Sequence, residues 1–303
     1  MNKETKVIRS TGEKTIRGIF SVMLFIVTLS TILVIGITVL NSFKTKGDLI
    51  KNTFGIPTEF TLESFKKVLT QDHFVRYFLN SIILTLGGIS LLIFLSSMTA
   101  YGLSRYKFKM KGAVQTYFML GLMFPIQLGL LPLFIILRSL GLLNNLLGLI
   151  LLYGAGMSFP VFVFSKFFST IPAALEESAR LDGAGEFTIY WKIILPICKP
   201  VLATIALINS VTIWNDFYMP LVFLSKASVR TLTLGVYKYM ESFLKNWNYA
   251  FAAVVVTLIP VILLYFMFSK QIVAGLTGGG IAQEEKEWND NNYRKWIEVH
   301  MPL

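Results

Sequence analysis

One short stretch of this 303-residue sequence places polar side chains inside an apolar segment, where they could do chemistry. Trp214, Asn215 and Asp216 lie in the apolar run 201–224, and Asn209 precedes them in the same run. A carboxylate in such a run is costly unless it faces protein or water, so Asp216 is a candidate functional residue. An aromatic face beside hydrogen-bonding side chains suits a sugar, and the stretch is therefore a candidate part of a solute path.

Other roles for Asp216 stay open on this evidence. Its carboxylate could accept a structural hydrogen bond from a neighbouring broken helix, because polar side chains commonly bond across helices in membranes. It could also serve a channel or a membrane enzyme. A channel needs no ATPase and an enzyme keeps its activity when isolated, so co-purification with a nucleotide-binding subunit would separate these classes.

No second arrangement with catalytic spacing is found in the sequence. There is no nucleophile–base pair and no glycine-rich loop with a phosphate-binding lysine. His73 and His300 are too few and too far apart in the sequence to indicate a metal site, and the single cysteine, Cys198, allows no internal disulfide. The sequence therefore predicts a chain that is not an enzyme and has no metal or cofactor of its own.

The composition is that of a membrane protein. Hydrophobic residues make up 54% of the chain and charged residues only 15%, with a mean hydropathy of +0.63, whereas average proteins carry about 25% charged residues. The net charge of +11 could suggest nucleic acid, but the basic residues flank apolar runs, as the orientation rule for membrane proteins expects. We therefore expect membrane lipid, and no nucleic acid, as a partner.

Six segments are long, apolar and nearly free of charge, and each has the roughly 20 residues needed to cross a bilayer. They cover residues 18–40, 78–103, 113–137, 145–168, 201–224 and 247–269. The first is too long for a signal-peptide core and lacks a clear cleavage site, so we expect it to remain as a membrane helix. The sequence thus predicts an all-α integral membrane protein with six transmembrane helices in a single membrane domain.

Lysine and arginine predict the orientation of these helices. The short loop Arg105–Lys111 carries four basic residues, and short loops carry most weight in the positive-inside rule. Six crossings put both termini on one side of the membrane. We therefore expect both termini and the polar stretch 171–200 in the cytoplasm.

The third and fourth apolar runs contain helix-breaking residues, including Pro125, Gly156 and Pro160. Such breaks are tolerated in membranes where neighbouring helices or a water-lined cavity satisfy the freed backbone groups. Ordinary kinking is one interpretation. The other is that Met123 and Gln127 face a transport path.

The polar stretch 171–200, IPAALEESARLDGAGEFTIYWKIILPICKP, predicts a short helix, a glycine turn and a second helix. Glu176 and Glu177 favour the positive end of the first helix, and Glu176 can pair with Arg180 at i,i+4. Gly183 is expected to end that helix in the left-handed conformation. On pattern alone, a helical hairpin lying on the membrane surface is an equally good interpretation.

This stretch resembles the EAA loop of ABC importer permeases. The matching residues are Glu177-Ser178-Ala179, Asp182-Gly183-Ala184, Ile194-Leu195-Pro196 and Pro200. The second glutamate, Glu176, and the bulky Phe187 resemble the carbohydrate-importer branch, specifically its maltose-type second permease subunit. Ser178 stands where the name-giving motif has alanine, and its small size preserves the packing.

The likeness extends over about residues 57–280. Further matches are Asn80-Ser81, Ala100–Phe108, Trp214–Phe217, Arg230-Thr231-Leu232, Asn246-Trp247, Pro260 and Gly275-Leu276-Thr277. The expected organisation is a cytoplasmic tail (1–17), a first membrane helix (18–40), an extracytoplasmic loop (41–77), a permease core (78–280) and a cytoplasmic C-terminal tail (281–303).

The resemblance implies a type I ABC importer permease fold, in a bacterial-type cytoplasmic membrane, whose loop docks on a separate ATPase. The implied coupling residues are Glu176, Glu177, Ser178, Ala179, Asp182, Gly183 and Ala184. The implied partners are a second permease subunit, two ATPase copies that bind ATP and Mg, and an extracytoplasmic solute-binding protein. The expected function is an ATP-driven permease subunit for a sugar or oligosaccharide, forming half of the path by alternating access. An importer of another solute is the alternative in the same class.

Overall fold

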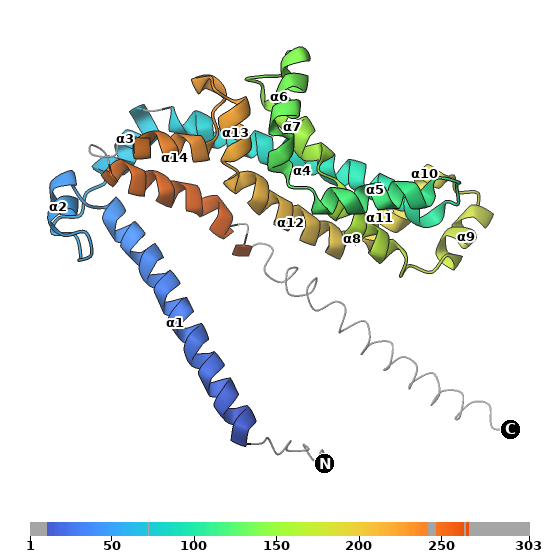
Figure 1. The fold of residues 1–303 in the computed structure, drawn as a ribbon, viewed down its shortest axis with the longest axis horizontal. Coiled ribbons are helices and arrows are strands. Elements are labelled where there is room, and N and C mark those ends of the chain that lie inside the picture. The colour runs from blue at the N-terminus through green and yellow to red at the C-terminus, as the bar shows by residue number, and fades with distance from the viewer. Residues whose placement is uncertain (1–10, 72, 242–246, 264, 267–303) are drawn as a thin grey trace. The chain divides into compact units, whose positions relative to one another are not determined.

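The computed structural model describes residues 11–71, 73–241, 247–263 and 265–266, and every regular element in these residues is a helix (Figure 1). The predicted all-α fold class is thereby confirmed. Most of the N-terminal tail, the Gly275-Leu276-Thr277 match, the end of the sixth predicted segment and the tail 281–303 lie outside the described residues.

The chain divides into two compact units. The first comprises Met1–Phe74 and Val236–Val256, and the second comprises Val75–Gly235 and Thr257–Leu303. The predicted division into tails, first membrane helix, loop and permease core stays a prediction.

The first unit contains three N-terminal helices, α1 (Thr11–Ser42), α2 (Lys46–Lys51) and α3 (Glu63–Gln71). α1 contains the first predicted segment, and its side chains are exposed from Ile16 to Ile35, as suits a helix surrounded by lipid. α3 lies in the predicted extracytoplasmic loop 41–77, and its first N–H, that of Glu63, donates to the Thr61 hydroxyl at 3.2 Å.

The second unit is built along α4 (Phe74–Arg105), of which all but the first residue belong to it. The helices that follow are α5 (Lys111–Met123), α6 (Leu130–Ser139), α7 (Leu146–Ala155), α8 (Ser158–Phe168), α9 (Ala174–Leu181), α10 (Glu186–Ile189), α11 (Leu195–Ile197), α12 (Lys199–Asn215) and α13 (Tyr218–Phe223). α14 (Leu232–Glu241) and the helix Trp247–Leu263 are divided between the two units.

Two helices are long and apolar enough to cross a membrane alone, Ile16–Ser42 and Phe74–Arg105. Three pairs pass the same test only when each is taken as one bent span. They are Lys111–Met123 with Ile126–Ser139 (99°), Leu146–Ala155 with Ser158–Phe168 (44°) and Glu186–Ile197 with Lys199–Asn215 (75°). The predicted segments are therefore not six straight helices, and the number of six crossings stays a prediction.

The 99° bend lies in the third predicted segment, 113–137, at Phe124 and Pro125. Proline has no N–H to donate and disfavours the helical conformation at the residue before it. Phe124 is accordingly extended, with φ −88° and ψ 118°, and α5 ends at Met123. Sequence reasoning located this break, whereas it did not predict how sharply the two halves diverge.

The fifth predicted segment, 201–224, is two helices rather than one. α12 ends at Asn215, Asp216 takes an extended conformation, and α13 begins at Tyr218. The Asp216 carboxylate accepts a hydrogen bond from the Met219 N–H at 3.2 Å, as a side chain does that caps a helix start. The acidic residue thus marks the end of a helix and not its interior.

α4 and α7 approach closely at glycines. A Cβ on Gly154 of α7 would lie 2.5 Å from the Leu91 side chain of α4, and a Cβ on Gly87 would lie 2.8 Å from the Ile150 side chain of α7. Small residues permit such contacts between membrane helices.

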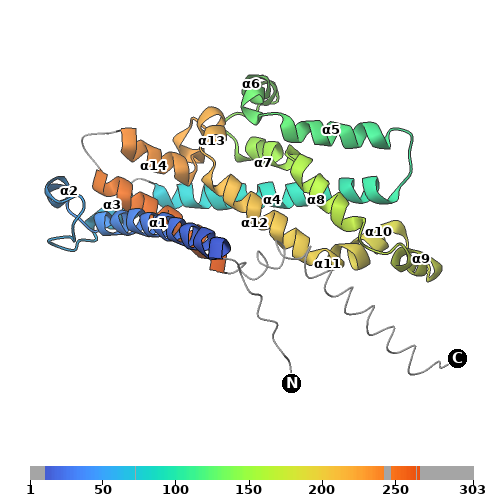
Figure 2. The same ribbon diagram turned by 60° about the horizontal axis from the view of Figure 1, so that its bottom comes forward.

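The loop helices α9, α10 and α11 lie beside the C-terminal end of α4 in both views (Figures 1 and 2). An apolar cluster joins these elements to α8 and α12. Its buried members include Tyr101, Phe164, Phe168, Ile189, Tyr190, Ile194, Cys198 and Ile205. This cluster gives the loop a fixed base.

Candidate functional site

The stretch 171–200 folds as predicted into a short helix, a glycine turn and a second helix. Gly183 lies in the turn with φ +84°, the left-handed conformation that glycine adopts without strain. The N–H of Gly183 donates to the Arg180 carbonyl at 3.0 Å, and the N–H of Ala184 donates to the Ala179 carbonyl at 2.9 Å. These bonds satisfy the last carbonyls of α9, so the turn is tight and defined.

The two neighbouring glutamates of α9 have opposite environments. Glu176 is only 2% exposed and forms an ion pair with Arg105 of α4, with 2.5 Å between Oε1 and Nε. Its other oxygen accepts a hydrogen bond from the Tyr101 hydroxyl at 3.3 Å. Glu177 is exposed. In the chain by itself, Glu177 is available to a partner protein, whereas Glu176 holds α9 against α4.

A second set of charges joins the two sides of the turn. Arg180 makes the predicted i,i+4 pair with Glu176 at 3.5 Å and also donates from Nε to Glu186 of α10 at 2.7 Å. The Tyr106 hydroxyl donates to the other Glu186 oxygen at 2.7 Å. The hydrogen bonds from Arg180 and Tyr106 lower the pKa of Glu186, and the bond to Glu186 raises the pKa of Tyr106 and of Arg180.

The outer face of α9 and α10 combines charge with exposed apolar side chains. Of the predicted coupling residues, Glu177, Ser178, Asp182 and Gly183 are exposed, whereas Glu176 and Ala179 are buried and Ala184 is half-buried. Beside them Leu181 is 89% exposed and Phe187 67% exposed. Exposed apolar groups rimmed by polar residues are typical of a surface that binds a protein or a membrane.

Asp216 lies where α12 ends, and several helices bond to it. Its carboxylate accepts hydrogen bonds from the Tyr153 hydroxyl of α7 at 2.8 Å and from the Met219 N–H of α13. Its carbonyl accepts from the Thr233 hydroxyl of α14 at 2.9 Å. The bond from Tyr153 is of the kind that the structural interpretation of Asp216 predicts, because α7 belongs to a bent pair.

The other predicted path residues near Asp216 differ in exposure. Trp214 is buried, donates from Nε1 to the Thr257 carbonyl at 3.3 Å and meets the Phe78 ring edge-on at 5.8 Å between centroids. Asn215 is exposed and Asn209 half-buried, and each amide donates to the carbonyl four residues earlier in α12. Their place on a solute path stays a prediction.

Met123 and Gln127 lie at the sharp break between α5 and α6, and both are exposed. Gln127 is in a short 3₁₀ turn, Ile126–Gly129. The hydrogen bonds described for Asp216 come from other residues, so the described contacts do not bring the two parts of the predicted path together.

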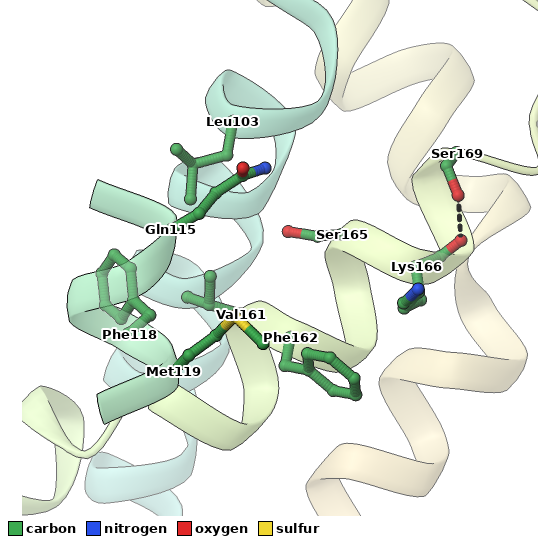
Figure 3. Close-up of a pocket in the computed structure, with 9 residues that line it drawn as sticks. All are labelled: Leu103, Gln115, Phe118, Met119, Val161, Phe162, Ser165, Lys166 and Ser169. Carbon is green, nitrogen blue, oxygen red and sulfur yellow. Dashed lines mark hydrogen bonds between the residues drawn. The ribbon is translucent and has the colours of Figure 1, made fainter. Parts of the chain in front are cut away.

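A cavity of about 350 Å³ lies between α5 and α8, with Leu103 of α4 at its edge (Figure 3). The Ser165 hydroxyl points across it toward α5, and most other groups around it are apolar. Its lining residues are Leu103, Gln115, Phe118, Met119, Val161, Phe162, Ser165, Lys166 and Ser169. None of the predicted path residues is among them.

Comparison with known proteins assigns the chain to a family. Residues 92–277 match the family described as binding-protein-dependent transport system inner membrane component. The chain belongs to this family. The matched range includes α9, the Gly183 turn and Asp216, so both candidate sites lie within it. Because the family consists of membrane transport components, the chain is a transport subunit and not an enzyme.

Two relatives and one solved structure are similar over most of the chain. The probable starch degradation products transport system permease protein of Thermoanaerobacterium thermosulfurigenes is 33% identical over 82% of this chain and 90% of that protein. The diacetylchitobiose uptake system permease protein of Streptomyces coelicolor is 33% identical over 79% of this chain and 80% of that protein. A bacterial ABC transporter involved in alginate import matches with a TM-score of 0.76 and 25% identity, over 87% of this chain and 98% of that one.

Sequence reasoning missed three residues that the structure places in the sites. Arg105 counted only toward the positive loop and the family match, Tyr101 only toward the end of a span and that match, and Tyr153 was not singled out. No signal in the sequence indicated the contact of Arg105 with Glu176, because Glu176 was expected to pair with Arg180. For Tyr153 nothing in the sequence indicates that it meets a residue 63 positions later.

Proposed function

We propose that this chain is one permease subunit of an ATP-driven importer for a sugar or an oligosaccharide. The observation that carries the proposal is the coupling surface of α9 and α10, in which Glu177, Leu181 and Phe187 are exposed around a turn of fixed geometry. Membership of a binding-protein-dependent transport family supports it. The substrate class is taken from the relatives whose names specify starch products and diacetylchitobiose.

In this proposal the chain works as part of a larger assembly. A second, homologous permease subunit supplies the other half of the path, and alternating access carries the solute between them. Two copies of an ATPase bind ATP and Mg and receive the surface of α9 and α10. An extracytoplasmic solute-binding protein delivers the sugar, in keeping with the family description.

The proposed orientation follows from the basic residues. Arg105–Lys111 and the stretch 171–200 lie in the cytoplasm of a bacterial-type cell membrane, and so do both termini. This places the exposed apolar side chains of α9 and α10 on the side where ATP is available.

Reconstitution of the assembly tests the proposal. The chain is expressed with its partner permease, ATPase and binding protein, and proteoliposomes are assayed for uptake of maltotriose, diacetylchitobiose and an alginate oligosaccharide. We expect co-purification of the ATPase and uptake of one of these probes that requires both ATP and the binding protein. Uptake without the ATPase would indicate a channel. Enzymatic activity of the isolated chain would indicate an enzyme, and uptake of non-sugar solutes alone would indicate an importer of another class of solute. Any of these results would overturn the proposal.

A further inference from the structure

We propose that Arg105 is a positioning residue that fastens α9 to the end of α4, so that both move as one body when an ATPase displaces α9. The inference rests on the proposed function, because it requires a separate ATPase. Arg105 lies outside the loop motif, at the end of α4. Through it, a displacement of α9 would reach a long membrane helix.

Arg105 holds the loop at two points. Its Nε faces Glu176 Oε1 at 2.5 Å, and its Nη2 donates to the Ile171 carbonyl at 3.0 Å. Ile171 lies in the connection between α8 and α9, and Glu176 lies in α9 itself, so the two partners stand on either side of Pro172. A connection without regular structure would absorb a push on α9, but this one is bridged by a single guanidinium. The guanidinium of arginine presents its N–H donors in a rigid planar fork, whereas a lysine ammonium is a single charge on a flexible stem.

The contact is buried, and the other cation described near Glu176 is the more exposed Arg180, whose Nη2 lies 3.5 Å from Oε2. The side chains of Arg105 and Glu176 are 14% and 3% exposed. Neither Arg105 Nε nor Glu176 Oε1 has a hydrogen-bond partner in the described part of the chain, so the ion pair is the polar contact that each of them has there. Removing Arg105 leaves Glu176 only the longer and more exposed pair with Arg180, and a poorly compensated charge is costly in a buried site. The pair therefore resists separation when α9 is displaced.

Tyr101 gives Glu176 a second contact with α4, which also restricts the rotation of α9. Its hydroxyl donates to Glu176 Oε2, and its ring packs edge-on against Phe168 at the end of α8, with 6.0 Å between centroids. Glu176 thus meets α4 through two residues one helical turn apart, which fixes the rotation of α9 as well as its distance. By contrast, the side chains of Arg180 and Glu186 are nearly half exposed. Solvent therefore screens the attraction between them, and this pair holds α9 less firmly than the buried pair does.

A distance measurement in the complete transporter tests the proposal. Spin labels are placed at Met98 of α4 and Ala174 of α9, both exposed, in a Cys198→Ser chain. Pulsed EPR then compares the nucleotide-free complex with the ATP-bound complex. We expect one unchanged distance distribution with Arg105 present, and a distribution that shifts or broadens with ATP in Arg105→Ala. A distance that already changes in the chain with Arg105 would overturn the proposal.

Transport measurements give a second, independent reading on the same complexes. We expect the ATP hydrolysed per solute imported to rise severalfold in Arg105→Ala and Glu176→Gln, and less in Arg105→Lys, which keeps the charge without the fork. Lys109→Ala, an exposed residue of the same basic loop, is the matched control and should change nothing. If Arg105→Ala does not assemble, Arg105→Lys and Glu176→Gln carry the test.

The outcomes separate the two proposals. In Arg105→Ala and Glu176→Gln, uptake and hydrolysis could fall only as far as the amount of assembled complex falls. That result would show that the ion pair is merely structural, and it would overturn this inference. Loss of ATP-dependent sugar uptake in the complex without substitutions would instead count against the proposed function.

Discussion

The Tyr153 hydroxyl donates a 2.8 Å hydrogen bond to the Asp216 carboxylate, joining two helices from residues 63 positions apart. The second carboxylate oxygen caps α13, and the Asp216 carbonyl accepts from Thr233 of α14. Asp216 is therefore a joint at which α7, α12, α13 and α14 are held together. A residue of this kind can brace a transport path without touching the solute.

Asp216→Ala is expected to reduce uptake while the complex still assembles, because it removes both carboxylate bonds. A hydrogen bond to a charged group contributes about 1.5–3 kcal/mol, so the thermal stability of the purified complex should also fall. Tyr153→Phe removes only one bond and should lower stability by less. Uptake assays and thermal unfolding of the same preparations measure both effects.

The neighbouring Asn215→Ala is the control for Asp216, because Asn215 is exposed and its amide bonds only within α12 among the described contacts. It should leave stability close to that of the parent chain. If Asp216→Ala changes neither uptake nor stability, the carboxylate is merely accommodated. If assembly collapses, its role is to hold the fold.

The orientation of the chain predicts a difference in labelling between Lys109 and Lys226, which are both exposed. In a Cys198→Ser background, Lys226→Cys should react with a membrane-impermeant thiol reagent added from outside the cell, and Lys109→Cys should react only after permeabilisation. Gel-shift detection of the modified thiol measures this. The reverse pattern would place the α9 surface outside the cell and remove it from any ATPase.

The pH dependence of the α9–α10 turn follows from Glu186. The bonds from Arg180 and Tyr106 hold the pKa of Glu186 below its ordinary value of 4.5, so the folded state favours the ionised carboxylate. The stabilisation is present above pH 4.5 and is lost as the pH falls through the lower, folded-state pKa. We therefore expect Glu186→Gln to lower the thermal midpoint above pH 4.5.

The difference between Glu186→Gln and the parent chain should shrink on further acidification. It should also shrink in high salt, because both Arg180 and Glu186 are substantially exposed. Glu59→Gln, another exposed glutamate, is the control and should follow the parent chain throughout. A difference that persists unchanged in strong acid would refute the ion-pair explanation.

Local chemistry made much of the loop predictable from the sequence. Gly183, Arg180 and Glu176 lie close together in the chain, so the turn and the i,i+4 pair follow from short-range rules. The capping of α13 by Asp216 was not predicted, because the hydrophobic pattern of 201–224 does not distinguish one continuous helix from two shorter ones. The partners of Glu176 and Asp216 are long-range contacts, and their choice depends on how α4 and α7 pack.

Reversal of charge at Glu177 tests whether the coupling surface of α9 and α10 binds the ATPase. Glu177 is exposed and forms no ion pair among the described residues, so Glu177→Lys should leave the fold of the chain intact. If a basic residue of the ATPase meets it, the reversed charge should weaken association by at least about tenfold, as truncation of interfacial charge pairs does. ATPase binding to the purified permease pair measures this, with Glu177→Gln expected to be milder.

Gly183 and Gly185 form a matched pair for testing whether the turn must keep its shape. At both positions an added Cβ would have no neighbouring atom within 4 Å, so added bulk meets open space. They differ in backbone: Gly183 has φ +84°, whereas Gly185 has φ −73° and ψ 159°, an extended conformation that valine favours. Gly183→Val should cost more than the roughly 1–2 kcal/mol of an ordinary residue in the left-handed region, and Gly185→Val should cost little.

The expected result is that Gly183→Val weakens ATPase docking or uncouples hydrolysis from uptake, while Gly185→Val behaves as the parent chain. A subunit that hydrolyses no ATP must receive its power stroke mechanically, and only a turn of fixed shape transmits a displacement from α9 to α10 and the apolar cluster beneath it. ATPase association, solute-stimulated hydrolysis and uptake are measured together on reconstituted complexes. If Gly183→Val and Gly185→Val both match the parent chain in ATPase association, hydrolysis and uptake, the shape of the turn does not matter for coupling. The helices α9 and α10 would then be a passive hairpin at the membrane.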